Sequence, residues 1–85
     1  MAKNFMTLDV LSPQNRIFSG TVSCVVLPGS KAPFTVLCNH APIISTLTKG
    51  RLSWIAGDTE QSIIVSGGFV EVKDNVITVC VEAYE

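Results

Sequence analysis

The stretches VLCNHAPII (residues 36–44) and VSGGFVEV (residues 65–72) decide the fold of this chain. Each is a turn of special backbone residues flanked by strand-forming apolar residues, because proline and asparagine favour turns and glycine adopts conformations that other residues avoid. Turn signals recur about every ten residues, β-branched residues crowd the stretches between them, and no long segment has helical periodicity. This pattern predicts one all-β domain over residues 1–85, a two-sheet β-sandwich of about eight to ten short strands.

The expected strands follow from alternation and from the turn residues between them. They cover residues 5–11, 20–27, 34–37, 43–47, 52–55, 62–65, 69–73 and 76–81. Residues 20–27 are apolar on both faces, which predicts a central strand. Gly67-Gly68 predicts a bulge or a sharp corner at which the two sheets approach closely, and Asp74-Asn75 predicts a tight hairpin turn. Residues 82–85 are too few to nucleate a helix.

The composition excludes several classes of function. The net charge is −1, with 47% hydrophobic and 15% charged residues, so the chain is not disordered and its apolar excess favours a dense core plus contact with a partner. The basic residues are scattered, which argues against nucleic-acid binding. No apolar run approaches the roughly 20 residues that span a bilayer, and residues 1–5 lack the pattern of a secretory signal. The odd number of cysteines, three, indicates a cytosolic protein without a disulfide framework.

Cysteine and histidine raise the question of a metal or catalytic site. Cys38 and His40 lie two residues apart, but a zinc site needs three or four ligands and no acidic residue nearby could orient the imidazole. Three interpretations of His40 stay open: a turn residue that bonds to backbone, an interface residue, and a general base for Cys38 or a nearby serine. Cys24 and Cys80 lie in apolar strands and are expected to pack in the core. We expect no catalytic residue, metal or cofactor.

Two further features have alternative interpretations. Ser66-Gly67-Gly68 could cradle a phosphate, but such loops precede a helix, and here a strand is expected to follow. Close backbone approach explains these glycines better. Trp54 is the sole tryptophan and lies near Arg51 in the sequence, an aromatic and a cation of the kind enriched in interfaces. A partly buried core position and an interface position both stay open for Trp54.

Several short motifs follow one another along the chain. They are LDVLSP (residues 8–13), IFSG (17–20), VVLPG (25–29), VLCNHAP (36–42), SGGFVEV (66–72) and VITV (76–79). In this order the chain, from about Leu8 to Val81, resembles the N-terminal β-sandwich domain of the epsilon chain of bacterial F-type ATP synthase. Each motif alone is weak, whereas their joint order is specific. The resemblance implies a non-enzymatic subunit of the rotating central stalk, which ties the gamma chain to the membrane ring of c subunits and couples proton flow to ATP synthesis.

The resemblance also implies which residues make the contacts. Those toward the gamma chain are Ser12, Ile43, Ile44 and Arg51. Those toward the c ring are Ser30, Lys31, Ala32 and Pro33. The residues that structure the turns are His40, Pro42, Gly67 and Gly68. The loop that is expected to contact the c ring, residues 30–35, departs from the family pattern, because lysine and proline replace the usual acidic and glycine residues. We therefore expect the opposite charge complementarity with the ring. Asn39 ends a Cys-Asn pair that replaces the usual Pro-Gly, and asparagine tolerates the positive φ of that turn.

Many members of this family continue into a C-terminal helical hairpin that inhibits ATP hydrolysis, and this chain stops at Glu85, where that hairpin would begin. We therefore expect it to support coupling without restraining hydrolysis by that route, and not to bind ATP. The implied location is the cytoplasmic face of the bacterial inner membrane, reached only through the complex. The alternative is a free-standing β-sandwich adaptor for another protein, and a small hydrolase that uses His40 is a third interpretation.

Overall fold

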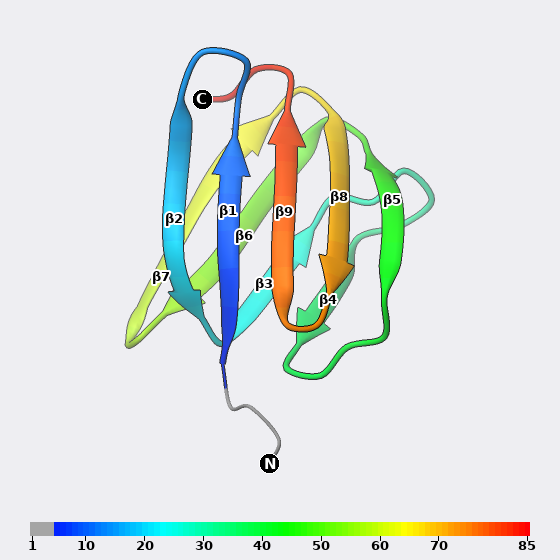
Figure 1. Cartoon of the computed structure of the whole chain (residues 1–85). Helices are drawn as coiled ribbons and strands as arrows, with labels where there is room; N and C mark the ends of the chain where they lie inside the picture. Colours follow the sequence, from blue (N-terminus) through cyan, green and yellow to red (C-terminus); the bar gives the residue numbers. More distant parts are fainter. Residues whose placement is uncertain (1–4) are drawn as a thin grey trace.

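The computed structural model describes residues 5–85, which form nine β-strands in two sheets that face each other (Figure 1). The strands are β1 (Met6–Leu11), β2 (Arg16–Val22), β3 (Cys24–Leu27), β4 (Phe34–Leu37), β5 (Ile43–Leu47), β6 (Gly50–Ala56), β7 (Thr59–Val65), β8 (Gly68–Lys73) and β9 (Val76–Val81). The predicted two-sheet, all-β sandwich is confirmed. No helix in the described part of the chain is long and apolar enough to cross a membrane. The interpretation of the N-terminus as lacking a secretory signal rests mostly on residues 1–4, which lie outside the described residues.

The strand order places the first and the last strand side by side. The five-stranded sheet has the order β2-β1-β9-β8-β5, and the four-stranded sheet has the order β4-β3-β6-β7. Neighbouring strands are antiparallel except β1 and β9, which run parallel near the centre of the larger sheet, with Leu8 opposite Ile77 (Figure 1). The sequence does not predict this parallel pair, because alternation reveals strands but not their partners.

Alternating side chains fill the space between the sheets. In β1, Met6, Leu8 and Val10 are at most 1% exposed, and the residues between them point away from the core. The other strands contribute buried valine, leucine and isoleucine in the same way. Trp54 is 3% exposed and packs against Phe18, with ring centroids 4.9 Å apart, which closes the core between β2 and β6. The core interpretation of Trp54 is therefore confirmed.

The prediction of one central strand over residues 20–27 is wrong. The chain leaves the larger sheet at the end of β2, passes Ser23 and enters the smaller sheet as β3. Val22 and Val25 are both buried, so the inward-facing positions change from even to odd at this crossing. When a segment passes from one sheet to the other, its buried residues fall at even positions before the crossing and at odd positions after it. Its sequence is then apolar at both even and odd positions, like that of a strand buried on both faces. β3 is central in its sheet, whereas β2 is an edge strand.

Gly67 and Gly68 form the corner at which the chain returns from β7 to β8 and so changes sheet again. Their φ angles are 153° and 150°, a region that residues with a side chain rarely adopt. A Cβ on Gly68 would overlap the backbone carbonyl oxygen of Cys80. The predicted corner is present, but the expected approach of the two sheets is wrong. The close contact joins β8 to β9 within one sheet, and β8 pairs there without a bulge.

The last turn and the tail complete the fold. Asp74 and Asn75 have positive φ angles of 52° and 62° in the two-residue turn between β8 and β9, as hairpin twist favours. Residues 82–85 form no helix and instead lie along the end of β7, where Tyr84 bridges antiparallel to Val65. The tail therefore adds a short piece of ladder to the edge of the smaller sheet.

Candidate functional site

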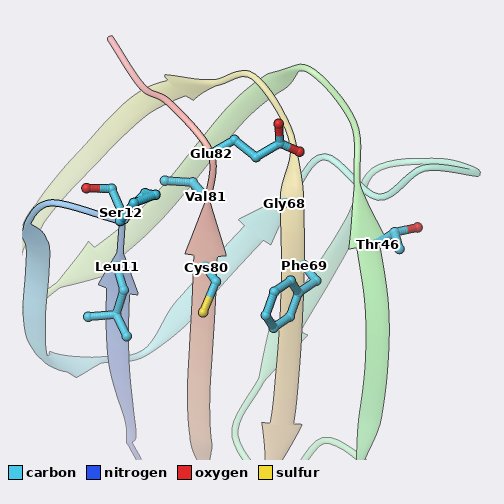
Figure 2. A pocket seen from close by; sticks show the side chains of 9 residues that line it. Leu11, Ser12, Thr46, Gly68, Phe69, Cys80, Val81 and Glu82 are labelled. Atoms are coloured by element: carbon cyan, nitrogen blue, oxygen red, sulfur yellow. The ribbon is translucent and has the colours of Figure 1, made fainter.

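Apolar side chains gather on the outer face of the five-stranded sheet, at the end where β1 and β9 finish. The register places Leu11, Cys80, Phe69 and Thr46 in one row across β1, β9, β8 and β5. Phe69 is 51% exposed, and Leu11 and Cys80 are half-buried. Figure 2 shows these side chains standing on the same side of the sheet. At these positions the outer face of the sheet carries apolar side chains, whereas solvent-exposed positions of a strand usually carry polar ones.

This row forms the floor of a groove of about 560 Å³, which we name the outer groove. Its lining consists of Leu11, Ser12, Pro13, Thr46, Gly68, Phe69, Cys80, Val81 and Glu82 (Figure 2). Among these residues only Glu82 is charged. Exposed apolar patches of this kind mark interaction sites, because they gain free energy when another surface covers them.

Ser12 forms the rim of the outer groove in the turn between β1 and β2. Its hydroxyl donates a hydrogen bond to the carbonyl oxygen of Asn15 (3.2 Å) and accepts one from the Asn15 N–H (3.1 Å). The backbone N–H of Ser12 also donates to the carbonyl oxygen of Asn15 (2.8 Å). These three bonds fix the turn, so Ser12 is held in one place relative to the groove.

Ile44 on β5 projects from the outer face of the five-stranded sheet, as Thr46 does. It is 77% exposed, the most exposed of the large apolar side chains in residues 5–85. Its neighbour Ile43 is half-buried and packs against the core. Both border a second groove of about 650 Å³, between β5 and the loop after β3, which we name the loop groove. Its lining consists of Gly29, Ser30, Lys31, Ala32, Phe34, Ile43, Ile44, Ser45 and Thr46. Lys31 is the charged residue of this lining.

The loop after β3 is fastened to β5. The Ser30 N–H donates to the carbonyl oxygen of Thr46 (3.1 Å), and the hydroxyl groups of the same two residues lie 2.9 Å apart. The loop groove therefore brings together five sequence-based candidates: Ser30, Lys31, Ala32, Ile43 and Ile44. Pro33 is exposed next to them and is not part of the lining. Thr46 lines both grooves, so the two surfaces are adjacent.

Arg51 does not lie with the other candidates. It belongs to β6 in the four-stranded sheet and points outward, because its neighbour Leu52 is fully buried. There its Nη1 donates a hydrogen bond to the hydroxyl of Ser62 on β7 (3.0 Å). Ser12 and Ile44 are on the opposite side of the sandwich, so the structure separates Arg51 from both grooves.

The expected core packing of Cys24 and Cys80 is wrong. Both are half-buried and turned outward, since their neighbours Val25 and Val79 are the residues that face the core. Cys80 is part of the outer groove, whereas Cys38 packs against the core. In residues 5–85, no three cysteine, histidine or acidic side chains come together in a way that could hold a metal ion.

The turn that contains His40 is pinned to the hairpin between β8 and β9. Asn39 has a positive φ of 66°. Its backbone N–H donates to the side-chain oxygen of Asn75 (2.6 Å), and the Asn75 amide donates back to the side-chain oxygen of Asn39 (3.1 Å). His40 donates from Nδ1 to the carbonyl oxygen of its neighbour Ala41 (2.7 Å), and Pro42 follows, exposed, just before β5. These contacts fix the direction in which the chain enters β5 and so place Ile44.

Asn75→Gly is expected to lower the free energy of unfolding by about 1–2 kcal/mol, since it permits the positive φ but deletes two hydrogen bonds. Asp74→Gly is the matched control, because Asp74 has a similar φ in the same turn and no side-chain hydrogen bond within the described structure. It should change stability by about 0.5 kcal/mol or less. Urea denaturation followed by the fluorescence of Trp54 measures both. Equal effects would contradict a role for the Asn39–Asn75 pair.

Sequence reasoning missed the floor of the outer groove, although a signal was present. In β8, the exposed positions that alternate with the core carry Phe69, Glu71 and Lys73. Two of these are charged, as solvent-facing positions usually are, whereas the third is a large aromatic side chain. A large apolar residue at an outward position of an alternating strand is the feature that could have revealed the groove.

The comparison with known families agrees with the ordered motifs. Residues 5–85 match the family model of the ATP synthase delta/epsilon chain, beta-sandwich domain, and the chain therefore belongs to this family. The resemblance inferred from the sequence is confirmed. The ATP synthase epsilon chain of Leptospira borgpetersenii serovar Hardjo-bovis (strain JB197) is 40% identical over 74 residues, which are 87% of this chain and 58% of that protein. The chain spans about three fifths of the length of the curated relatives that it matches.

Solved structures contain the same fold. One is a chain in a cryo-EM structure of the mitochondrial ATP synthase of Euglena gracilis (OSCP/F1/c-ring), with a TM-score of 0.92 and 19% identity over 100% of this chain and 55% of that one. Another is a chain in the central stalk/c-ring structure of the Tetrahymena thermophila mitochondrial ATP synthase, with a TM-score of 0.81 and 16% identity over 100% of this chain and 69% of that one. At these identities the likeness concerns the fold.

Proposed function

We propose that this chain is the β-sandwich of a rotor subunit in the central stalk of an F-type ATP synthase, a non-catalytic part that links the gamma chain to the c ring. Family membership and relatives named ATP synthase epsilon chain support this function. The observation that carries it is the pair of adjacent grooves, which share Thr46 on one rigid body. A subunit that joins two partners needs two such surfaces.

The outer groove is the proposed contact for the gamma chain. Ser12 forms its rim, and Ile44 lines the adjacent loop groove on β5, two residues before Thr46, which both grooves share. Covering Phe69 and Ile44 removes large apolar side chains from water, and full burial of such a side chain contributes about 1.5–3 kcal/mol. A few buried anchors of this kind carry most of the binding energy of an interface, and nearly uncharged surroundings keep the desolvation cost low. Arg51, on the other side of the sandwich, has no place in this contact.

The rim of the loop groove is the proposed contact for the polar loops of the c ring. Lys31 is exposed there, on a loop that the Ser30–Thr46 hydrogen bonds hold against β5. Its ammonium group attracts acidic groups over a distance of about 8–10 Å at physiological salt. The ring of this enzyme should therefore present acidic or carbonyl groups to Lys31, in place of the cations that an acidic loop would meet.

Transmission of torque between these partners requires a stiff body. Backbone ladders run through both sheets, and the isolated bridge between Gly29 and Leu47 ties the loop after β3 to β5. Close-packed interiors have low compressibility, so a force applied at one groove reaches the other with little deformation. In this role the chain lies at the cytoplasmic face of the bacterial inner membrane, held there through the gamma chain and the c ring.

Co-purification with the gamma chain of the same organism tests the proposed function. A tagged form of this chain, produced together with the gamma chain, is expected to retain the gamma chain through repeated washing at low and at high ionic strength. The reason is that an apolar contact does not depend on salt. A folded chain that retains no gamma chain under any of these conditions would contradict the central-stalk function.

Lys31→Glu is expected to reduce proton-driven ATP synthesis roughly fivefold at low ionic strength and much less at high ionic strength, because an exposed ion pair contributes about 1 kcal/mol and is screened by salt. Membranes that contain the complete enzyme provide the assay. Lys49→Glu is the matched control, since Lys49 is an exposed lysine in a turn outside both grooves. Equal rates for the Lys31 variant and the wild type at every ionic strength would remove Lys31 from the ring contact.

A further inference from the structure

Thr46 on β5 stands between the two grooves and lines both of them. On one side it lies directly opposite Phe69 of β8, the large exposed side chain on the floor of the outer groove. Residues that face each other in an antiparallel pair have Cβ atoms about 4.5–5.5 Å apart, so these two side chains are close neighbours. On the other side Thr46 meets Ser30, which precedes Lys31 in the loop groove. One side chain therefore adjoins the surfaces proposed for both partners.

The start of the loop after β3 lies against the end of β5 as a short antiparallel ladder. The Thr48 N–H donates to the carbonyl oxygen of Pro28 (2.9 Å). The Ser30 N–H donates to the carbonyl oxygen of Thr46 (3.1 Å), and the hydroxyl groups of these two residues lie 2.9 Å apart. We name the two bonds between Ser30 and Thr46 the latch. Within residues 5–85, Lys31 makes no hydrogen bond or ion pair of its own, so its position depends on the latch directly before it.

The hydroxyl of Thr46 lies at the edge of the outer groove and not on its floor. Figure 2 shows its oxygen pointing away from Phe69, on the side where it bonds to Ser30. A threonine side chain has three staggered positions about χ1, so a rotation would break this bond and bring the hydroxyl to the side of the groove. Once a partner covers the groove, a hydroxyl there would be buried without a hydrogen bond, which is costly. Cover of the outer groove therefore favours the latched loop over a released one.

We propose that the hydroxyl of Thr46 is a positioning group, which holds Lys31 in place for the c ring and makes that position depend on the gamma chain. This inference rests on the proposed function of the two grooves and adds a coupling between them. When the gamma chain covers the outer groove, the released loop becomes less populated, and Lys31 is presented in one position. Coupling between two sites is reciprocal, so contact of the ring with Lys31 should strengthen gamma binding by the same factor, about fivefold.

Hydrogen exchange of the Ser30 amide measures the latch in the free chain, because this amide donates to Thr46. Thr46→Val removes the hydroxyl and keeps the branched shape, so the Ser30 amide should exchange about fivefold faster, as for the loss of one hydrogen bond. Thr46→Ser keeps the hydroxyl and should exchange like the wild type. Thr48→Val is the matched control, since Thr48 is exposed, lies outside both grooves and makes no side-chain hydrogen bond within residues 5–85. It should leave exchange of the Ser30 amide unchanged.

The same amide reports the effect of the gamma chain. At saturating gamma chain, the Ser30 amide of the wild type and of Thr46→Ser should exchange about fivefold more slowly than in the free chain. In Thr46→Val no hydroxyl is left to bury in the groove, so the gamma chain should change this rate by less than about twofold. Mass spectrometry with fragmentation to single residues resolves the Ser30 amide in the complex.

The complete enzyme shows whether the latch acts through Lys31. In membranes that contain it, Thr46→Val should lower proton-driven ATP synthesis about twofold at low ionic strength, because the ammonium group of Lys31 is no longer held toward the ring. In a chain that already carries Lys31→Glu, the same substitution should have no further effect, since both changes act on one contact. Thr46→Ser should restore the wild-type rate.

The possible failures of this inference differ from those of the proposed function. Equal Ser30 exchange in Thr46→Val and Thr46→Ser, or an effect of Thr48→Val as large as that of Thr46→Val, would overturn the latch. Equal protection by the gamma chain in Thr46→Val and the wild type would overturn the coupling. Additive losses from Thr46→Val and Lys31→Glu would overturn the positioning of Lys31. Each of these results leaves gamma binding intact, whereas a wild-type chain that binds no gamma chain would contradict the proposed function and this inference with it.

Discussion

Ile44→Asp is expected to weaken binding of the gamma chain by about 3 kcal/mol, or roughly 150-fold, because it buries an unpaired carboxylate in an apolar contact. Ile44 is 77% exposed, so the substitution removes little from the core of the free chain. The new carboxylate would also stand directly opposite Glu71 on β8, where like charges repel. Isothermal titration calorimetry with the purified gamma chain measures the loss.

Two further variants separate binding from folding. Ile44→Lys places a cation opposite Glu71, which favours the free fold, and it should still weaken gamma binding because a charge is buried there. Leu37→Asp is the matched control, since Leu37 is a 56% exposed leucine at the end of β4 in the other sheet. It should leave the affinity within about twofold, as for a surface change outside the contact. A folded Ile44→Asp chain with wild-type affinity would exclude this face as the gamma surface.

Gly68→Ala is expected to lower the free energy of unfolding by about 3–5 kcal/mol, since it combines a strained φ with a steric overlap. The φ of 150° is unfavourable for any residue with a side chain. The added methyl group would overlap the carbonyl oxygen of Cys80, which is backbone in the paired strand β9 and cannot move aside like a flexible side chain. Such a loss is a large part of the total stability of a small domain. Equilibrium urea denaturation measures it.

Two other glycines with positive φ separate these causes. Gly67→Ala has nearly the same φ, 153°, but its Cβ would lie 3.5 Å from the nearest atoms, so only the backbone strain of about 1–3 kcal/mol applies. Gly57→Ala, at the tip of the hairpin between β6 and β7, has a φ of 64° and open space around it, with an expected cost of about 1–2 kcal/mol. A Gly68→Ala chain as stable as Gly67→Ala would contradict the overlap with β9.

The sequence predicted the strands best where alternation and turn residues coincide. β5 and β9 have the expected bounds, because each is framed by turn residues and keeps one parity throughout. The prediction failed at residues 20–27, where the inward-facing parity changes as the chain crosses between sheets. A pattern of apolar residues records burial and does not record against which sheet a residue is buried.

The candidate site was predictable only in part, for a related reason. Of the residues that the family motifs suggest, Ser12 lines the outer groove, and Ile44 and Lys31 line the loop groove. The floor of the outer groove depends on the pairing of β1 with β9 and of β9 with β8, which brings Leu11 next to Cys80 and Phe69. Those contacts are long-range, and local periodicity contains no information about them.

The parallel pairing of β1 with β9 determines when the larger sheet can be completed during synthesis. Leu8 and Ile77 lie opposite each other although about 70 residues separate them in the chain. At about 5–20 residues per second, a ribosome needs roughly 4–14 seconds to make that interval. During this time β1 has only β2 as a neighbour within its sheet. β1 thus acquires its second neighbour only after β9 has been made, so the larger sheet closes late in synthesis.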